Sequence, residues 1–168
     1  MAAKRVFSMT NDFTQFNRGW KSKNGAQGIC TAASLAWAKK CLQGRRITSL
    51  SDLGVSAHSL NAQMAVLRQY DADPARQTEM AGLEMVGNDR AVASFDDLAR
   101  YVKTTSPHVA IFWTGGHTMG YRYTHHRKEF FDIEDGLYWA KLTKDIRKKV
   151  NESYGGELVG VRVVKLPS

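Results

Sequence analysis

The hydrophobic pattern of the chain changes at His108. Upstream of it, apolar residues recur at three- and four-residue spacing, which is typical of amphipathic helices. Downstream of it come short apolar runs separated by turn residues, and these runs predict strands. They lie at 109–113, 117–123, 129–133 and 158–165, with one further helix expected at 143–153. A helical part followed by an antiparallel β-sheet predicts an α+β fold.

The chain has 168 residues, of which 43% are hydrophobic, so we expect residues 1–168 to form a single domain with a sizeable core. The formal charge of +8 favours an acidic partner, whether an acidic protein face, an anionic membrane surface or nucleic acid. No apolar run approaches the roughly 20 residues that span a bilayer, and the N-terminus lacks the pattern of a signal peptide. We therefore expect a soluble chain that, if it leaves the producing cell, does so without a cleaved signal.

In the helical part, residues 5–9 predict a short edge strand, and 11–27 is rich in Asn, Gln, Gly and Lys, which predicts a loop. The helix that starts at Cys30 carries a core-facing stripe and ends near Gly44. A second helix is expected at 58–70, after a short turn at 51–52. A third opens at Ser94, with Asp97 three residues on, and ends before Pro107. Residues 72–89 are interpreted as a weakly patterned connection.

Cys30 is the first candidate catalytic residue, because it follows a flexible polar run and opens a helix. The unpaired amides and the positive dipole end of a helix N-terminus favour the thiolate, which is the nucleophilic form. Cys41 lies about 16 Å away along the same helix, too far for a disulfide, so both thiols are expected to be reduced. With no Cys/His metal-ligand spacing, we expect no metal and no cofactor, and a reducing compartment as the place of action.

His117 and Asp132 are the candidate base and its orienting carboxylate. A tight turn centred on Thr124 and His125 places His117 opposite Asp132. A five-residue loop would instead place Asp135 opposite His117, and Asp132 would then lie about 10 Å along the strand from that position. In either register the carboxylate lies near the imidazole. A helix-end thiol with a His and an Asp on neighbouring strands is the nucleophile, base and orienter arrangement of a cysteine hydrolase.

The oxyanion of such a reaction needs two hydrogen-bond donors. The backbone amide of Cys30 is one, and the side-chain amide of Asn24 or Gln27 is a candidate second, since both lie just upstream. Trp139 either shields the bond between His117 and the carboxylate from water or fills the core. Each candidate also has a purely structural interpretation. The cysteine could be a small core residue, the histidine a core residue with its hydrogen bonds made, and the aspartate a residue that only ends a strand.

Three segments resemble the motifs of the YopT/AvrPphB-type cysteine proteases, which are bacterial effectors with a papain-like fold. They are Gly-Ile-Cys at 28–30 with Trp37 downstream, Gly-Gly-His-Thr-Met at 115–119, and Phe-Phe-Asp-Ile-Glu-Asp-Gly-Leu-Tyr at 130–138. The resemblance covers residues 24–138. It implies a papain-like fold, Cys30, His117 and Asp132 as the triad, and Asn24 rather than Gln27 as the oxyanion donor. It also implies delivery into a host cell and cleavage of a host protein in a reducing cytosol.

The sequence therefore predicts a monomeric papain-like thiol hydrolase that cleaves a peptide bond in a target protein with an acidic or membrane-associated surface. A glutamine deamidase, an acyl transferase and a murein amidase use the same chemistry and stay open as alternatives. A non-catalytic basic binding module is the alternative of another class. It requires basic residues gathered on one face, whereas here they are spread along the chain without a nucleic-acid-binding motif, so we do not expect a nucleic-acid partner.

Overall fold

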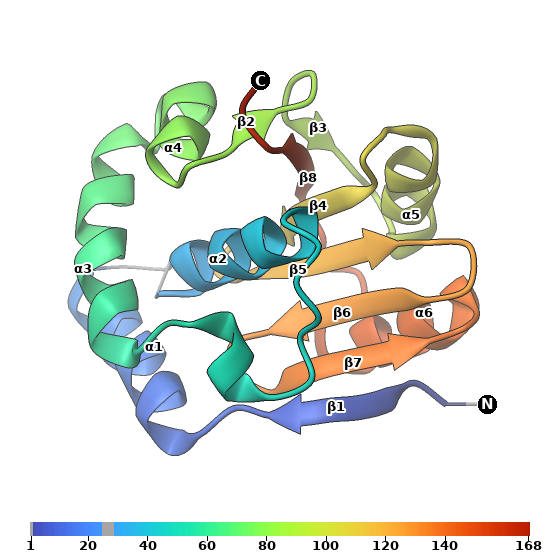
Figure 1. The fold of residues 1–168 in the computed structure, drawn as a ribbon, viewed down its shortest axis with the longest axis horizontal. Coiled ribbons are helices and arrows are strands. Elements are labelled where there is room, and N and C mark those ends of the chain that lie inside the picture. The colour runs from blue at the N-terminus through green and yellow to red at the C-terminus, as the bar shows by residue number, and fades with distance from the viewer. Residues whose placement is uncertain (1, 25–28) are drawn as a thin grey trace.

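The computed structural model describes residues 2–24 and 29–168, and its centre is an antiparallel sheet (Figure 1). The strands are β1 Lys4–Ser8, β2 Glu84–Met85, β3 Arg90–Ala91, β4 Val109–Trp113, β5 Thr118–Tyr123, β6 Lys128–Asp132, β7 Gly136–Ala140 and β8 Gly160–Lys165. The helices are α1 Asn11–Asn24, α2 Cys30–Leu42, α3 Ala57–Leu67, α4 Pro74–Met80, α5 Phe95–Thr104 and α6 Thr143–Tyr154, with short 3-10 helices at Leu50–Leu53 and Arg68–Tyr70.

The strands are hydrogen-bonded in the order β1-β7-β6-β5-β4-β8-β2, and β3 also pairs with β8. Every pairing is antiparallel. Consecutive strands from β4 to β7 lie next to one another, whereas β1 and β8 join them from the two ends of the chain. The expected α+β class is confirmed, and β1 lies at the expected sheet edge.

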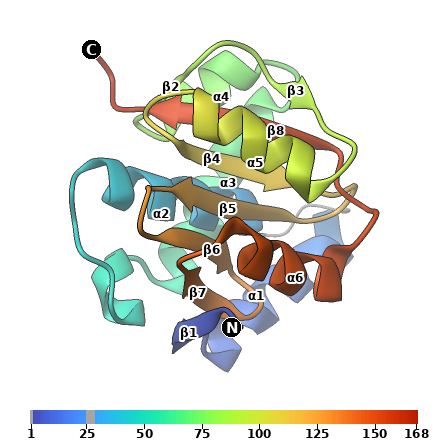
Figure 2. The same ribbon diagram turned by 90° about the vertical axis from the view of Figure 1, so that its right-hand side faces the viewer.

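Helices cover both faces of the sheet (Figures 1 and 2). On one face α2 packs across β4, β5 and β6, α3 packs against α2, and α4 packs against α3; on the other face α5 and α6 pack against the sheet and against each other. Successive residues of a strand point to opposite faces. Ile111 accordingly belongs to the core around α2, whereas its neighbours Ala110 and Phe112 belong to the core around α5 and α6.

The docking of α2 on β5 depends on a close approach between Trp37 and Gly120. The Trp37 ring is fully buried and stacks on Phe131 of β6, with centroids 5.8 Å apart and an interplanar angle of 8°. A Cβ atom on Gly120 would lie 2.4 Å from two carbons of that ring, so only glycine lets the indole lie flat on the sheet. This contact sets the height of α2 above the strands, and Cys30 is the first residue of α2.

Two expectations for the chain before α5 are wrong. Residues 11–24, expected as a loop, form α1, because Phe13 and Phe16 at helical spacing give it an apolar stripe that outweighs its polar composition. The segment 72–89 is not a plain connection, since it contains α4 and β2. There Asp73 accepts the amide of Arg76, and Pro74 is the first helical residue, which together form a recognisable helix start.

The start of α5 lies where the sequence places it. The Ser94 side chain accepts the amide of Asp97 at 3.2 Å and opens α5 as expected. β7 is an additional strand that the sequence pattern did not indicate, because its residues are buried on both faces and do not alternate. No helix in the described part of the chain is long and apolar enough to cross a membrane.

Candidate active site

Cys30 lies at the N-terminus of α2, as expected, and its side chain is fully buried. Its sulfur nevertheless has a polar surrounding, because the backbone amide of Thr118 in β5 donates a hydrogen bond to Sγ at 3.3 Å. Two further contacts join α2 to the same strand residue: the hydroxyls of Thr31 and Thr118 lie 3.2 Å apart, and the Ser34 hydroxyl donates to the Thr118 carbonyl at 3.3 Å. The start of α2 is thus tied to the start of β5.

His117 lies in the tight connection between β4 and β5. The connection is closed by a hydrogen bond from the amide of Thr114 to the carbonyl of His117 at 2.9 Å, and Gly115 and Gly116 form its tip. Because Thr118 follows directly, the strand that donates an amide to Cys30 also carries the imidazole. The His117 side chain is buried, with 5% of its surface exposed.

Asp132 lies at the end of β6, and its Oδ1 accepts a hydrogen bond from Nε2 of His117 at 2.7 Å. The register differs from both expected ones: Thr124 and Arg127 pair with each other, and Gly120 lies opposite Phe131. The turn is therefore centred one residue later than expected, on His125 and His126. This shifts the pairing by two residues from the tight-turn register, and a shift of two keeps a side chain on the same sheet face. His117 and Asp132 then meet as diagonal neighbours.

Tyr154, the last residue of α6, is a site residue that the sequence analysis missed. Its hydroxyl donates to the second carboxylate oxygen of Asp132, Oδ2, at 2.5 Å. Its ring also stacks on the imidazole of His117, with centroids 5.3 Å apart and an interplanar angle of 25°. A tyrosine at a helix end carries no sequence signal for this role. The shielding position considered for Trp139 thus belongs to Tyr154, whereas Trp139 lies beneath the guanidinium of Arg127.

The turn after β6 connects the site to α1. The backbone amide of Glu134 donates to Oδ1 of Asp132 at 3.0 Å, and the Asn17 side chain of α1 donates to the Glu134 carboxylate at 2.8 Å. Asn17 is fully buried. The helix that the sequence analysis missed therefore supports the turn that holds the carboxylate.

The pKa values of the pair follow from these contacts. Burial lowers the pKa of His117, but hydrogen bonds and charge from Asp132 and Cys30 outweigh it and raise the pKa to about 9. Burial raises the pKa of Asp132, but the hydrogen bonds from His117, Tyr154 and the Glu134 amide hold it below its usual value. Burial and the neighbouring carboxylate raise the pKa of Tyr154 far above its usual range. At neutral pH the imidazole is thus cationic, the carboxylate ionised and the phenol a proton donor.

The candidate oxyanion donors cannot be placed in this arrangement. Gln27 lies outside the described residues, and so does the side chain of Asn24. The backbone amide of Cys30 belongs to the first residue of α2. Among residues 2–24 and 29–168, no cluster of His, Cys, Asp and Glu side chains could hold a metal ion.

A polar cavity of about 250 Å³ adjoins the site, since Thr31 and Thr118 form part of its wall. Arg162 also lines this cavity and is held by Asp89 through two hydrogen bonds of 2.7 and 2.9 Å. Cys41 lies at the other end of α2, where burial raises the pKa of its thiol to about 12. Cys30 and Cys41 are both buried thiols that form no disulfide, and the Cys30 sulfur accepts the Thr118 amide.

No protein-family model and no curated protein matches the chain. Among solved structures, the fold is similar to that in the crystal structure of the Pseudomonas avirulence protein AvrPphB. The match has a TM-score of 0.56 and 14% sequence identity, and it covers 99% of this chain and 97% of the other. This similarity establishes the papain-like α+β fold and leaves the activity to be argued from the site.

Proposed function

We propose that the chain is a cysteine protease that cleaves a peptide bond of a protein substrate through Cys30, His117 and Asp132. The observation that carries the proposal is the hydrogen bond of 2.7 Å between His117 and Asp132, beside a sulfur that lies at a helix N-terminus and faces the same imidazole. A core cysteine needs neither a histidine nor an amide donor. The structural similarity to AvrPphB supports the same class of enzyme.

In this mechanism the Cys30 sulfur reacts as a thiolate, stabilised by the helix N-terminus, the His117 cation and the Thr118 amide. It attacks the carbonyl carbon of the scissile bond and forms a C–S bond. Nε2 of His117 is held by Asp132, which leaves Nδ1 to protonate the departing amine. The resulting thioester is hydrolysed by a water molecule that His117 deprotonates, and the thiolate returns.

Because Cys30 has no exposed surface, substrate access requires movement of the groups around it. The polar cavity lined by Thr31 and Thr118 offers space for a substrate side chain, and Thr118 also donates its amide to the Cys30 sulfur. The net charge of +8 favours a target with an acidic or membrane-associated surface. We further propose that the protein acts as a monomer in the reducing cytosol of a host or target cell, since a free thiolate requires reducing conditions.

Selective alkylation tests the thiolate without knowledge of the substrate. At pH 6, iodoacetamide is expected to modify Cys30 and spare Cys41, whose thiol stays protonated because burial raises its pKa to about 12. Peptide mapping by mass spectrometry gives the rate at each site. The rate at Cys30 should fall sharply in His117→Ala. Equal rates at the two cysteines of the folded protein would contradict the proposal.

Product analysis then separates the reaction types. Candidate substrate proteins are incubated with the wild-type chain, with Cys30→Ser and with the matched control Cys41→Ser. A new N-terminus that forms with the wild type and Cys41→Ser, and not with Cys30→Ser, supports a protease. A mass gain of about one dalton indicates deamidation instead, a cross-link indicates acyl transfer, and lysis of purified cell walls indicates a murein amidase.

A further inference from the structure

A second polar cavity lies at the C-terminal end of α2, about 16 Å from Cys30 along the helix. Its volume is about 330 Å³, and four arginines and one glutamate line it: Arg45, Arg46, Arg122, Arg127 and Glu129. We call it the arginine cavity. Positive side chains in its wall thus exceed negative ones by three. The catalytic residues proposed above take no part in it.

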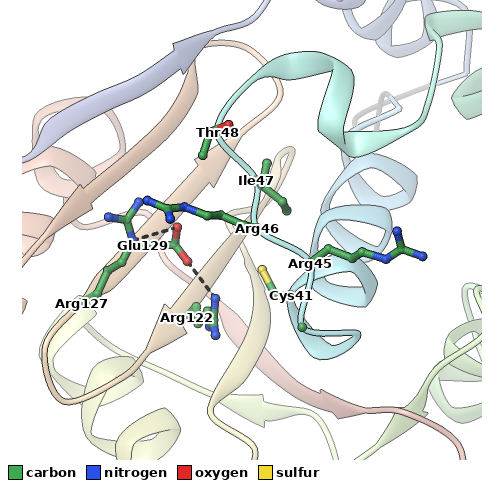
Figure 3. A pocket seen from close by; sticks show the side chains of 9 residues that line it. Cys41, Arg45, Arg46, Ile47, Thr48, Arg122, Arg127 and Glu129 are labelled. Atoms are coloured by element: carbon green, nitrogen blue, oxygen red, sulfur yellow. Dashed lines mark hydrogen bonds and ion pairs between the residues drawn. The ribbon is translucent and has the colours of Figure 1, made fainter.

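The chain reverses direction after α2, and this reversal brings Arg45 and Arg46 to the cavity. Gly44 adopts a φ of +73°, which favours glycine, and the amides of Gly44 and Arg45 bond back to the carbonyls of Cys41 and Lys40. The helix-end carbonyls are thereby satisfied within the backbone. Figure 3 shows Arg46 directed toward Glu129, whereas Arg45 points away from it. No hydrogen bond or ion pair joins Arg46 to another residue in the described part of the chain.

Glu129 holds the other two guanidinium groups in place. Arg122 donates to one of its oxygens through Nη1, and Arg127 to the other through Nε, each at 3.3 Å (Figure 3). The carboxylate is buried, with 7% of its side chain exposed. The Arg127 guanidinium also lies 4.7 Å from the ring centroid of Trp139. A guanidinium has five N–H donors, so both arginines keep donors for a further acceptor, in positions that are already fixed.

The chemistry of the wall selects the ligand. A guanidinium fork matches two oxygens of a phosphate group, and a phosphate carries about two negative charges at neutral pH, close to the charge excess of the cavity. The floor is formed by buried Cys41, which is neutral because its pKa is about 12, and by buried Ile47. A volume near 330 Å³ is at the lower end for small-molecule sites. A concave site of this size suits a compact soluble molecule better than an extended nucleic acid or a flat membrane.

We propose that the arginine cavity binds a small phosphorylated ligand with one or two phosphate groups, held by Arg46, Arg122 and Arg127. The two arginines on Glu129 provide the fixed donors, and Arg46 closes over the anion. The site is separate from the proposed catalytic site, so its existence does not depend on the protease activity.

Calorimetric titration with pyrophosphate at low ionic strength tests the proposal, because it measures binding directly. We expect saturable binding to one site, and a dissociation constant about tenfold higher or more in Arg46→Ala and in Arg127→Ala. Arg76→Ala is the matched control, since Arg76 is paired with Glu79 at the same 3.3 Å on the surface of α4. It removes the same charge and should leave the affinity within about twofold, as expected for distant charges screened by solvent.

Three results would overturn the proposal: no binding of pyrophosphate, equal binding of acetate, or an equal loss of affinity in Arg76→Ala. A second arm uses phospholipid vesicles that contain phosphatidic acid. Binding to vesicles without binding of pyrophosphate would also contradict a soluble ligand. Urea unfolding of each variant verifies that it is folded, and Arg46→Lys, which keeps the charge and loses the fork, should bind with an affinity between those of the wild type and Arg46→Ala.

Discussion

Replacement of Tyr154 by phenylalanine removes one hydrogen bond from the proposed site and keeps the ring that stacks on His117. The lost bond, of 2.5 Å, ends on the ionised carboxylate of Asp132, which is 3% exposed. A hydrogen bond to a charged group contributes about 1.5 to 3 kcal/mol, so Tyr154→Phe should lower the free energy of unfolding at pH 7 by about that amount. Urea unfolding monitored by tryptophan fluorescence measures it.

The pH dependence identifies the cause. The Tyr154 hydroxyl is one of the donors that hold the pKa of Asp132 below its usual value, so its loss raises that pKa. A carboxyl with a depressed pKa stabilises the fold above its unfolded pKa of about 4, and this stabilisation is lost as the pH falls further. The difference in stability between wild type and Tyr154→Phe should therefore be largest at neutral pH and shrink below about pH 4.

The same variant should affect the thiol through the imidazole. A less firmly held Asp132 stabilises the His117 cation less, and the cation stabilises the thiolate of Cys30. Alkylation of Cys30 at pH 6 should slow by up to about tenfold, the factor that corresponds to 1.4 kcal/mol. Tyr101→Phe is the control, because the half-buried Tyr101 hydroxyl makes no hydrogen bond to any residue of the described part. A Tyr154→Phe protein with wild-type stability and alkylation rate would refute this account.

Two further predictions concern the fold and the imidazole. Gly120→Ala places a methyl group 2.4 Å from the Trp37 ring and should destabilise the protein by about 1 to 3 kcal/mol or more in urea unfolding, whereas Gly115→Ala meets no atom within 4 Å and should have little effect. The pKa of His117 is raised from 6.5 to about 9, so the stabilisation from its protonation is complete below pH 6.5 and is lost as the pH rises through about 9. Relative to His117→Ala, the wild type should lose on the order of 3 kcal/mol over this range, and a pH-independent difference would contradict the ion pair.

The parts of the fold that the sequence predicts are those set by local chemistry. Ser94 caps α5 because a serine hydroxyl can accept an amide three residues on, and this needs no tertiary contact. The apolar run of β4 indicates a strand buried on both faces. Cys30 begins α2 as predicted, since the polar, glycine-containing stretch before it disfavours an earlier start. α1 differs from the expected loop because its two phenylalanines, at helical spacing, pack into the core despite the polar composition of the segment.

The site required contacts between distant segments. Both strand registers expected from the sequence place His117 near Asp132. The structure has a third register, which keeps the side chains on the same sheet face as the tight-turn register and brings Nε2 of His117 to 2.7 Å from Oδ1 of Asp132. Tyr154 could not be predicted, because it reaches Asp132 only through the packing of α6 on the sheet face opposite α2. The catalytic roles of Cys30, His117 and Asp132 stay predictions until the alkylation and product assays are done.

Hydrophobic spacing and capping act within a few residues of the chain, so the amino-acid sequence alone predicts the class of fold, the helix start at Cys30 and the residue types available for thiol chemistry. Packing in three dimensions places the Thr118 amide at the Cys30 sulfur and the Tyr154 hydroxyl at Asp132, and it gathers arginines from the turn after α2 and from the β5–β6 hairpin around one cavity. The two hydrogen bonds join residues that lie 88 and 22 positions apart in the chain. Their geometry depends on how helices and strands pack, which no local pattern encodes.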